Sequence, residues 1–447
     1  MLRLSFFFSP LFVLCVLCAL CVKFIPEPHA NSPMKPRLNE SAALPKLNPE
    51  LEDALGRAAD RRTMDRATAL LLAEQAPLPE LQHAATQMRA RGKGTVVSFS
   101  KKVFIPLTTL CRDYCSYCTF RKDPGQSGAH FMTPEEVLAL AEQGRQAGCK
   151  EALFSLGDRP ERIFPEARDF LRKQGFARTL DYVAAMSELV LEITGLLPHA
   201  NPGVMDRGAL ERLKDSNASV GLMLENVTPR LMRHGLPHAN APDKVPALRL
   251  RTIEQAGKLS IAFTTGILIG IGETVEERID SLFAIRMLHE KYGHIQEVII
   301  QNFRAKPEIP MAAHPEPSLE EMLRIVAIAR LILGPNMNVQ APPNLSYADF
   351  PRLLESGIND WGGISPVTKD FINPEAAWPQ IASLQAETES RGFALRERLA
   401  LYPEFIARDA FLSPRVRHRV AALSGADGFA RSAQTGAGAS IDHAPSK

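Results

Sequence analysis

The chain has 447 residues, of which 45% are hydrophobic and 23% are charged. A chain of this length and composition can bury at least one large core, as globular proteins do. The formal net charge of +2 is too small to attract nucleic acid or acidic lipid, so we expect neither as a partner. The seven cysteines are too few and too unevenly placed for a disulfide framework. This favours a reducing, cytoplasmic location.

An apolar extension occupies residues 1–33. Its segment Leu4–Val22 is about long enough to cross a bilayer and slightly longer than the core of a usual signal peptide. Three interpretations are open: a membrane anchor, a secretion signal, or translated sequence upstream of a true start at Met34. We favour the last, because the composition is that of a soluble protein from Met34 onward. Three cysteines in the extension have no polar neighbours and are interpreted as small hydrophobic residues rather than ligands: Cys15, Cys18 and Cys21.

Helices and strands are expected to alternate over most of the remaining chain. Apolar residues at helical intervals in Leu51–Leu72 and Leu78–Met88 indicate a helical lead-in over residues 34–94. The expected strands after it are Val96–Pro106, Ala152–Leu156, Leu196–Ala200, Ser219–Leu224, Ile261–Ile269, Glu297–Asn302, Val339–Ala341 and, more weakly, Gly362–Ser365. The expected helices are Pro134–Ala147, Thr179–Ile193, Asp206–Asp215, Pro242–Ala256, Val275–Tyr292 and Leu319–Leu331.

This alternation predicts an α/β fold with a parallel sheet, and so many consecutive crossovers favour a (β/α) barrel. We expect the barrel to span residues 95–345, and residues 346–424 to complete the barrel and the substrate site. Residues 425–447 are rich in Ala, Gly and Ser and are expected to form a disordered tail.

Polar residues follow nearly every expected strand, including Asp158, Asn201 and Glu225. In a parallel barrel the carboxyl ends of the strands share one face, where active sites are built. Each residue taken alone could simply end its strand. The number of charged and amide side chains at these ends nevertheless favours a functional site.

The strongest pattern is C-x3-C-x2-C, formed by Cys111, Cys115 and Cys118 directly after the first long strand. Three thiolates in a short loop can hold three irons of a [4Fe-4S] cluster and leave the fourth iron open to S-adenosylmethionine (SAM). A closed zinc site needs a fourth ligand, which no nearby CxxC or His pair supplies. A four-cysteine electron-transfer cluster would need Cys149, which ends a helical pattern and is interpreted as a core residue. Tyr117 could lie along the adenine of SAM or pack against the loop.

The triad with its preceding aromatic residue resembles the signature of the radical SAM superfamily. A closer resemblance, from about residue 40 to residue 400, is to the small subunit of 7,8-didemethyl-8-hydroxy-5-deazariboflavin synthase. The segments that carry it are KVFIPLTTLCRDYCSYCTF (102–120), LGDRPE (156–161), HANPG (199–203), LENVTPRL (224–231), GILIGIGET (266–274), QNFRAKP (301–307), QAPPNL (340–345) and INDWGGISPVTKDFINPE (358–375).

The resemblance implies that the three cysteines bind the cluster and that further residues bind SAM. Gly157 and Asp158 match the superfamily's Gly-Glu element near the amino group of SAM, although Asp is a shorter carboxylate than Glu. Glu225 matches a position near the ribose hydroxyls, where a carboxylate can accept two hydrogen bonds. Gly266 and Gly270 resemble parts of a strand whose backbone lies against adenine, since glycine permits close approach.

Amide and acid groups at the expected barrel mouth suit a uracil edge and a ribityl chain, although each could instead cap a helix or a turn. The predicted substrate-binding residues are Asn201, Gln301, Asn302, Asn344, Asn359 and Asp360. Ring closure and ammonia loss need acid or base groups. The candidates for this role are Asp158, Glu273 and Asp360, and no feature of the sequence selects among them.

The resembled family completes a deazaflavin chromophore. A sister subunit joins tyrosine to 5-amino-6-ribitylamino-uracil, and the subunit resembled here abstracts hydrogen from the adduct, closes the central ring and expels ammonia. We therefore expect a radical lyase with this adduct as substrate, the sister subunit as functional partner and a ferredoxin- or flavodoxin-type reductant. The alternatives are the sister subunit itself, a menaquinone-pathway relative, and a non-enzymatic iron–sulfur electron carrier.

Overall fold

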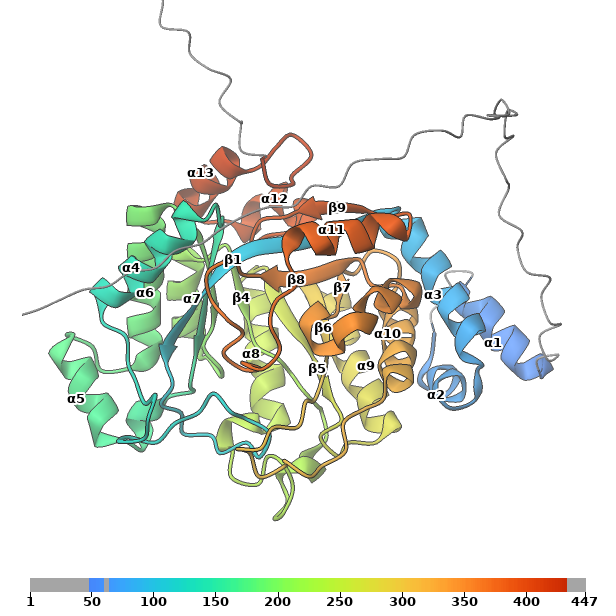
Figure 1. Cartoon of the computed structure of the whole chain (residues 1–447), viewed down its shortest axis with the longest axis horizontal. Helices are drawn as coiled ribbons and strands as arrows, with labels where there is room; N and C mark the ends of the chain where they lie inside the picture. Colours follow the sequence, from blue (N-terminus) through green and yellow to red (C-terminus); the bar gives the residue numbers. More distant parts are fainter. Residues whose placement is uncertain (1–47, 60–63, 432–447) are drawn as a thin grey trace, which may run out of the picture. The chain divides into compact units, whose positions relative to one another are not determined.

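A ring of parallel strands surrounded by helices forms the centre of the computed structural model (Figure 1). The structure describes residues 48–59 and 64–431, which belong to one structural unit, Leu47–Lys447. The apolar segment Leu4–Val22 and residues 432–447 of the expected tail lie outside the described residues. Within the described part of the chain, no helix is long and apolar enough to cross a membrane.

Eight strands close into a barrel because β1 pairs with both β2 and β8, while β2 to β8 pair in chain order. A ninth strand, β9, pairs in parallel with the first residues of β1. These pairings confirm the expected (β/α) barrel. The strands are β1 Val96–Thr108, β2 Glu151–Leu156, β3 Leu197–Asn201, β4 Ser219–Gly221, β5 Phe263–Ile269, β6 Ile295–Asn302, β7 Val339–Gln340, β8 Asp360–Ile364 and β9 Ala394–Glu397.

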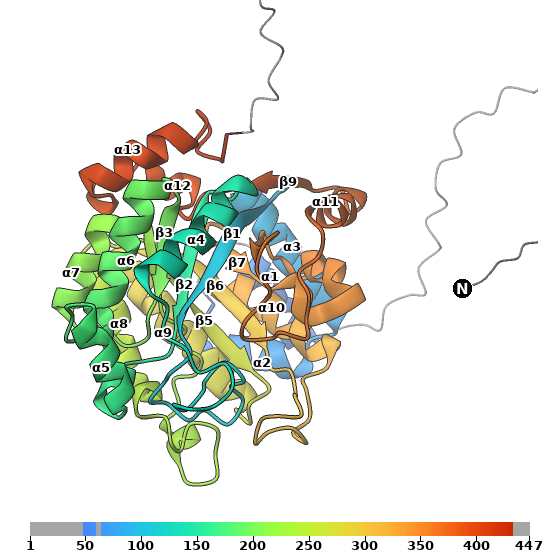
Figure 2. The same cartoon turned by 60° about the vertical axis from the view of Figure 1, so that its left-hand side comes forward.

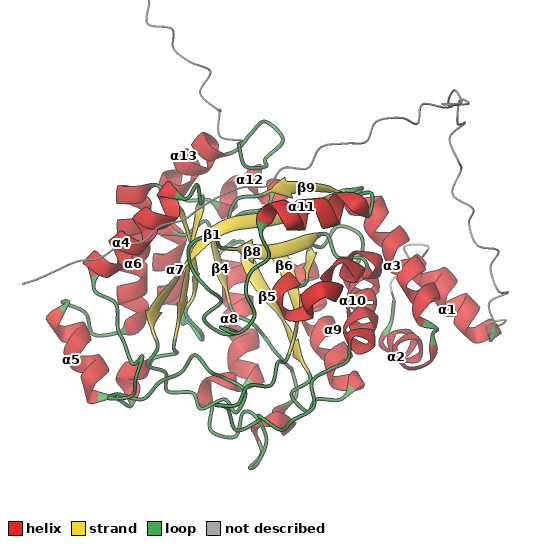
Figure 3. Ribbon diagram, viewed as in Figure 1, coloured by secondary structure: helices red, strands yellow, loops and turns green. Residues whose placement is uncertain are grey.

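Helices between the strands cover the outside of the barrel (Figures 2 and 3). They are α4 Pro134–Gln146, α5 Pro165–Lys173, α6 Thr179–Thr194, α7 Arg207–Ser216, α8 Pro246–Lys258, α9 Val275–Tyr292 and α10 Leu319–Leu333. Capping boxes fix the starts of α4, α9 and α10, at Thr133, Thr274 and Ser318. The helix expected from Pro242 instead begins at Pro246, after the short 3-10 helix η3, Pro242–Lys244. Proline suits the first helical position because it has no N–H to leave unpaired.

The lead-in consists of α1 Pro49–Ala59, α2 Arg66–Gln75 and α3 Leu78–Lys93. The helical pattern expected over Leu51–Leu72 is therefore divided between two helices. Asp65 begins the second of them, since its side chain accepts a hydrogen bond from the Thr68 N–H at 2.7 Å. Helix α2 packs against α9, and α3 packs against α10, so the lead-in forms part of the outer layer.

The segment that follows β9 covers the amino end of the barrel. The C-terminal part of the chain contains the 3-10 helix η4 Pro343–Ser356, which precedes β8, and then α11 Ile381–Ser390, β9, α12 Pro403–Ile406, η5 Asp409–Phe411 and α13 Pro414–Leu423. Leu399, Leu401 and Phe405 form one hydrophobic cluster with Leu197 and Ala262, which lie at or just before the starts of β3 and β5. Because this end of the barrel is closed, the functional site is left to the carboxyl end.

Candidate active site

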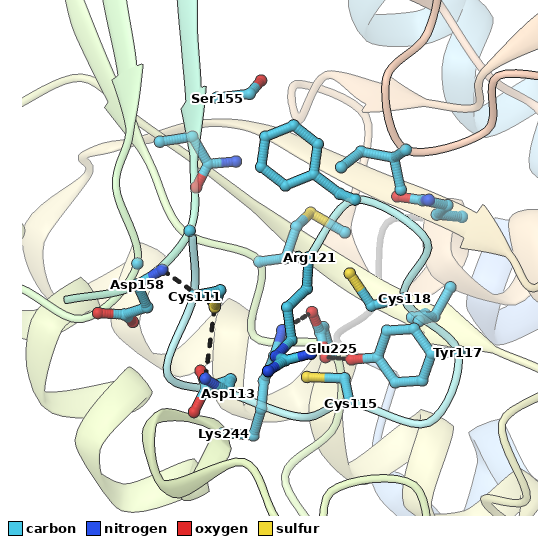
Figure 4. Close-up of a pocket in the computed structure, with 18 of the residues that line it drawn as sticks. Cys111, Asp113, Cys115, Tyr117, Cys118, Arg121, Ser155, Asp158, Glu225 and Lys244 are labelled. Atoms are coloured by element: carbon cyan, nitrogen blue, oxygen red, sulfur yellow. Dashed lines mark hydrogen bonds and ion pairs between the residues drawn. The ribbon is translucent and has the colours of Figure 1, made fainter. Parts of the chain in front are cut away.

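The loop between β1 and α4 carries Cys111, Cys115 and Cys118, which line one cavity of about 260 Å³. Figure 4 shows the three sulfur atoms facing the same space. All three thiols are half-buried and free of disulfides, whereas Cys149 is buried in the hydrophobic core. The structure therefore brings together the three predicted ligands and leaves the fourth cysteine in the packing role expected of it.

Two backbone N–H groups donate hydrogen bonds to the sulfur of Cys111, from Asp113 at 3.4 Å and from Asp158 at 3.2 Å. Such donors favour a thiolate, and they tune iron–sulfur clusters. Burial raises the pKa of Cys111 to about 12 and that of Cys115 well above its ordinary value. Without a metal ion these thiols hold their protons, and metal binding would release them. Three converging sulfurs with N–H donors fit an iron–sulfur cluster.

Gly157 allows the end of β2 to lie against the cysteine loop. A Cβ atom at this position would lie 2.0 Å from the Leu110 carbonyl oxygen and 2.6 Å from the Cys111 Cβ. No side chain fits there. The neighbouring Asp158 carboxylate accepts from the Val204 N–H at 3.0 Å and from Arg159 at 2.9 Å. Burial and the nearby Asp243 raise the pKa of Asp158 to about 7.

Glu225 is the centre of a buried network beside Tyr117 and Cys115 in the wall of the cavity (Figure 4). Its carboxylate accepts hydrogen bonds from the Tyr117 hydroxyl and from Lys244, and it lies 3.2 Å from His238. Lys244 and His238 hold the pKa of Glu225 well below its ordinary value, although burial opposes them. The φ angle of Glu225 is +62°, a left-handed conformation that is uncommon for residues other than glycine. Tyr117 is held by its hydroxyl and by edge-on packing against His238.

Gly266 and Gly270, expected near adenine, both belong to tightly packed positions at β5. A Cβ on Gly266 would lie 2.1 Å from the Ile299 carbonyl oxygen of β6, and one on Gly270 would lie 2.5 Å from Pro317. Between them, Leu268 lines the cavity. Close packing between strands therefore accounts for both glycines, whatever further contact they make with a cofactor.

A second, inner cavity of about 180 Å³ extends into the barrel. Its walls share five residues with the cysteine cavity, so the two spaces are neighbours: Ser155, Asn201, Gln301, Ile372 and Asn373. Trp361, Gly362 and Gly363 form part of its far wall.

The predicted substrate residues are divided by the structure. Asn201 and Gln301 line both cavities, and Asn302 lines the first while its amide donates to the Leu345 carbonyl at 3.2 Å. Asn344 is buried, and its amide donates to Asp370 and to the Ala376 carbonyl.

The prediction that Asn359 and Asp360 lie at the barrel mouth is wrong. Strand β8 begins at Asp360, so both residues lie at the amino end of the barrel. There Asp360 accepts from Arg398 at 2.7 Å, and Asn359 accepts from Arg330 at 2.7 Å. Asn359 precedes the strand and Asp360 begins it, whereas the mouth of a parallel barrel is formed by the carboxyl ends of the strands and the loops that follow them.

Glu273, an acid/base candidate, is also engaged in structural contacts. It accepts from the N–H groups of Gly270 and Ile271, both at 2.8 Å, and from Arg278 at 2.6 Å. It therefore shapes the turn that connects β5 to α9.

Sequence reasoning missed several polar residues of the inner cavity, namely Lys102, Glu151, His199, Glu297 and Gln340. Alternation within the strands was the available signal. In β2, Glu151, Leu153 and Ser155 all line this cavity, and in β3 His199 and Asn201 do the same. Charged residues at the inward positions of otherwise apolar strands indicate a polar barrel interior.

The fold and the three-cysteine site define a radical SAM protein, and residues 105–285 match the model of the "Radical SAM superfamily". The chain belongs to the family of 7,8-didemethyl-8-hydroxy-5-deazariboflavin (FO) synthases. It is 49% identical over 336 residues to the synthase of that name from Methanopyrus kandleri, covering 75% of this chain and all of that protein. It is 51% identical over 384 residues to the FO synthase of Streptomyces coelicolor, covering 83% of this chain and 44% of that protein. The chain thus spans about half the length of several relatives it matches.

Solved structures agree on the fold. The crystal structure of methylornithine synthase has a TM-score of 0.61 at 20% identity, covering 76% of this chain and 97% of that one. The maturase HydG from Carboxydothermus hydrogenoformans has a TM-score of 0.63 at 18% identity, covering 83% and 87%. Membership of the radical SAM superfamily implies a [4Fe-4S] cluster and SAM.

Proposed function

We propose that the chain forms 7,8-didemethyl-8-hydroxy-5-deazariboflavin from the adduct of tyrosine and 5-amino-6-ribitylamino-uracil, as a lyase that releases ammonia. The observation that carries this proposal is the junction of two cavities. The three-cysteine cavity adjoins a polar chamber inside the barrel through Ser155, Asn201 and Gln301. A polar substrate in the inner chamber would thus lie next to a cofactor in the outer one.

In this proposal Cys111, Cys115 and Cys118 bind the cluster, and SAM occupies the cavity that these cysteines and Glu225 line. Cluster and SAM together supply a radical that abstracts hydrogen. Glu225, kept ionised by Lys244 and His238, accepts hydrogen bonds from ribose hydroxyls. The ends of β2 and β5 complete the wall of the cofactor site.

Two partners belong to the same proposal. Relatives about twice as long as this chain suggest that a second activity accompanies this one, so we propose a sister radical SAM subunit as the source of the adduct. A ferredoxin- or flavodoxin-type protein would supply the electron that SAM cleavage consumes.

The test is anaerobic reconstitution of the chain with iron and sulfide, followed by dithionite, SAM and the synthetic adduct. We expect 5′-deoxyadenosine and the fluorescent deazaflavin from the wild type and neither from Cys115→Ala, while Cys149→Ala behaves as the wild type does. A well-formed cluster that yields no 5′-deoxyadenosine with adduct present would favour the electron carrier. If 5′-deoxyadenosine forms with a different product, the sister-subunit or menaquinone-pathway activity replaces the proposed one.

A further inference from the structure

The inner cavity contains polar side chains with no hydrogen-bond partner among the residues that the structure describes. In a buried site such groups carry a desolvation cost unless a ligand or water satisfies them. They come from four different strands, β2, β3, β6 and β7: the hydroxyl of Ser155, the Nε2 of His199, and the amides of Asn201, Gln301 and Gln340. His199 and Gln340 are each only 5% exposed.

The charged side chains of this cavity, in contrast, are all engaged with partners. Lys102 donates to Glu151 at 2.7 Å, and Arg398 donates to Glu297 at 2.9 Å. Asp370 accepts from the Asn344 amide at 3.0 Å. The groups left open are therefore neutral, which suits an uncharged ligand rich in hydroxyl and amide groups.

The hydrogen bonds of His199 determine which of its ring nitrogens is open. The Ser219 hydroxyl donates its one hydrogen to the Ala400 carbonyl oxygen at 2.6 Å, because that oxygen can only accept. Ser219 must then accept from the Nδ1–H of His199, at 2.7 Å. This assigns the neutral tautomer with an unprotonated Nε2. Burial lowers the pKa of His199 to about 4, so the ring stays neutral near pH 7 although Glu151 opposes the shift.

Gly221 of β4 leaves space beside this nitrogen. A Cβ at Gly221 would lie 2.9 Å from the Nε2 of His199. Any larger residue would crowd the nitrogen, and glycine leaves it open to the cavity.

We propose that His199 is a substrate-binding residue, whose Nε2 accepts a hydrogen bond from an N–H or O–H of the ribityl-uracil half of the substrate. This inference rests on the proposed function and identifies the inner cavity as the chamber for that half. Ser219 acts as a positioning residue, because it fixes the tautomer that presents an acceptor. A site that accepts a hydrogen bond from the ligand in this way discriminates against ligands that lack the donor.

The test uses the deazaflavin product as a fluorescent probe, titrated onto the reconstituted full chain without reductant, so that binding is measured apart from turnover. In His199→Asn the amide can still donate to Ser219 but offers no acceptor at the Nε2 position, and we expect the Kd to rise roughly 10-fold or more. In His199→Gln the longer amide reaches that position, and we expect the Kd to return to within about threefold of the wild type. His294→Asn, at a buried histidine bonded to the Ile253 carbonyl outside the cavities, is the matched control and should bind as the wild type does.

Wild-type affinity in His199→Asn would overturn the inference. Cluster content and thermal midpoint show whether that variant is folded. If it is not, Ser219→Ala decides instead, since we expect a Kd at least about threefold higher there and an unchanged value would overturn the inference. The two proposals can be contradicted separately. A wild type that forms no deazaflavin contradicts the proposed function. A wild type that forms deazaflavin, together with a His199→Asn variant of unchanged Kd, contradicts only the role of His199.

Discussion

At the scale of single residues, Gly157 gives a direct test of the cluster loop. Its missing Cβ would overlap the Leu110 carbonyl oxygen, 2.0 Å away, so Gly157→Ala must displace either the end of β2 or the loop that carries Cys111. We expect iron incorporation during reconstitution to fall at least about fivefold, because cluster binding needs three sulfurs in fixed positions. Iron and sulfide analysis measures this. Gly56→Ala, in α1 with nothing near its Cβ, is the control and should keep full iron content; equal iron in both variants would contradict the argument.

Local residue spacing was enough to predict the cysteine loop, since Cys111, Cys115 and Cys118 lie within one short segment. Other parts of the site are joined only by the fold. The Tyr117 hydroxyl reaches Glu225 across 108 residues of sequence, and Lys244 reaches the same carboxylate from the segment before α8. Neither contact has a sequence signal, which is why Lys244 and His238 were not predicted.

At the scale of elements, the amphipathic and apolar patterns located nearly every strand and helix of the barrel. They placed the last barrel strand at Gly362–Ser365, whereas β8 begins two residues earlier, at Asp360, and in both cases Asp360 lies at the amino end of the strand. They also missed β9, which is four residues long and half-exposed, so it has little hydrophobic pattern. Its position depends on pairing with β1, a contact that links residues about 300 apart in sequence.

The segment after β9 seals the amino end of the barrel through Arg398, whose guanidinium lies 2.7 Å from Asp360 and 2.9 Å from Glu297. Arg398→Met would leave two buried carboxylates without their cation, and we expect a loss of about 3–5 kcal/mol in the free energy of unfolding. Arg415→Met is the control, because the pair of Arg415 with Glu188 is about half exposed and should be worth less than about 1 kcal/mol. Urea denaturation measures the free energy of unfolding of both variants. Equal losses would contradict a larger stabilising contribution from the buried pair.

At the scale of the whole molecule, the two ends of the barrel have different roles. The amino end is filled by paired charges and by the hydrophobic cluster around Leu399 and Tyr402, so it contributes stability. The carboxyl end and the interior hold the cysteine cavity and the unpaired polar groups, so they are available for chemistry. Polar groups kept ready for a ligand are costly in its absence. The ligand-free protein is therefore expected to be less stable than the loaded one.

Buried neutral histidines should make stability depend on pH across the whole chain. Burial lowers the pKa of both His199 and His294 to about 4, below the value of 6.5 expected in the unfolded chain. The unfolded state therefore binds the extra protons first as the pH falls, so the stability present above pH 6.5 is lost on the way down to pH 4. Between pH 7.5 and 5.5 each histidine should cost roughly 1.4 kcal/mol.

Urea denaturation of the wild type, His199→Gln, His294→Gln and the double variant at both pH values measures this dependence. His199 lies in β3 and His294 lies directly before β6, and they have no shared hydrogen-bond partner, so their effects should add. The double variant should therefore lose roughly 3 kcal/mol less than the wild type over the interval. Carboxylates and other groups that do not interact with these two histidines titrate equally in all four proteins and cancel in the comparison. The same pH dependence in all four proteins would mean that these imidazoles have the same pKa in the folded and unfolded states. His199 would then become protonated below about pH 6.5, and its Nε2 would be a hydrogen-bond acceptor only above that pH.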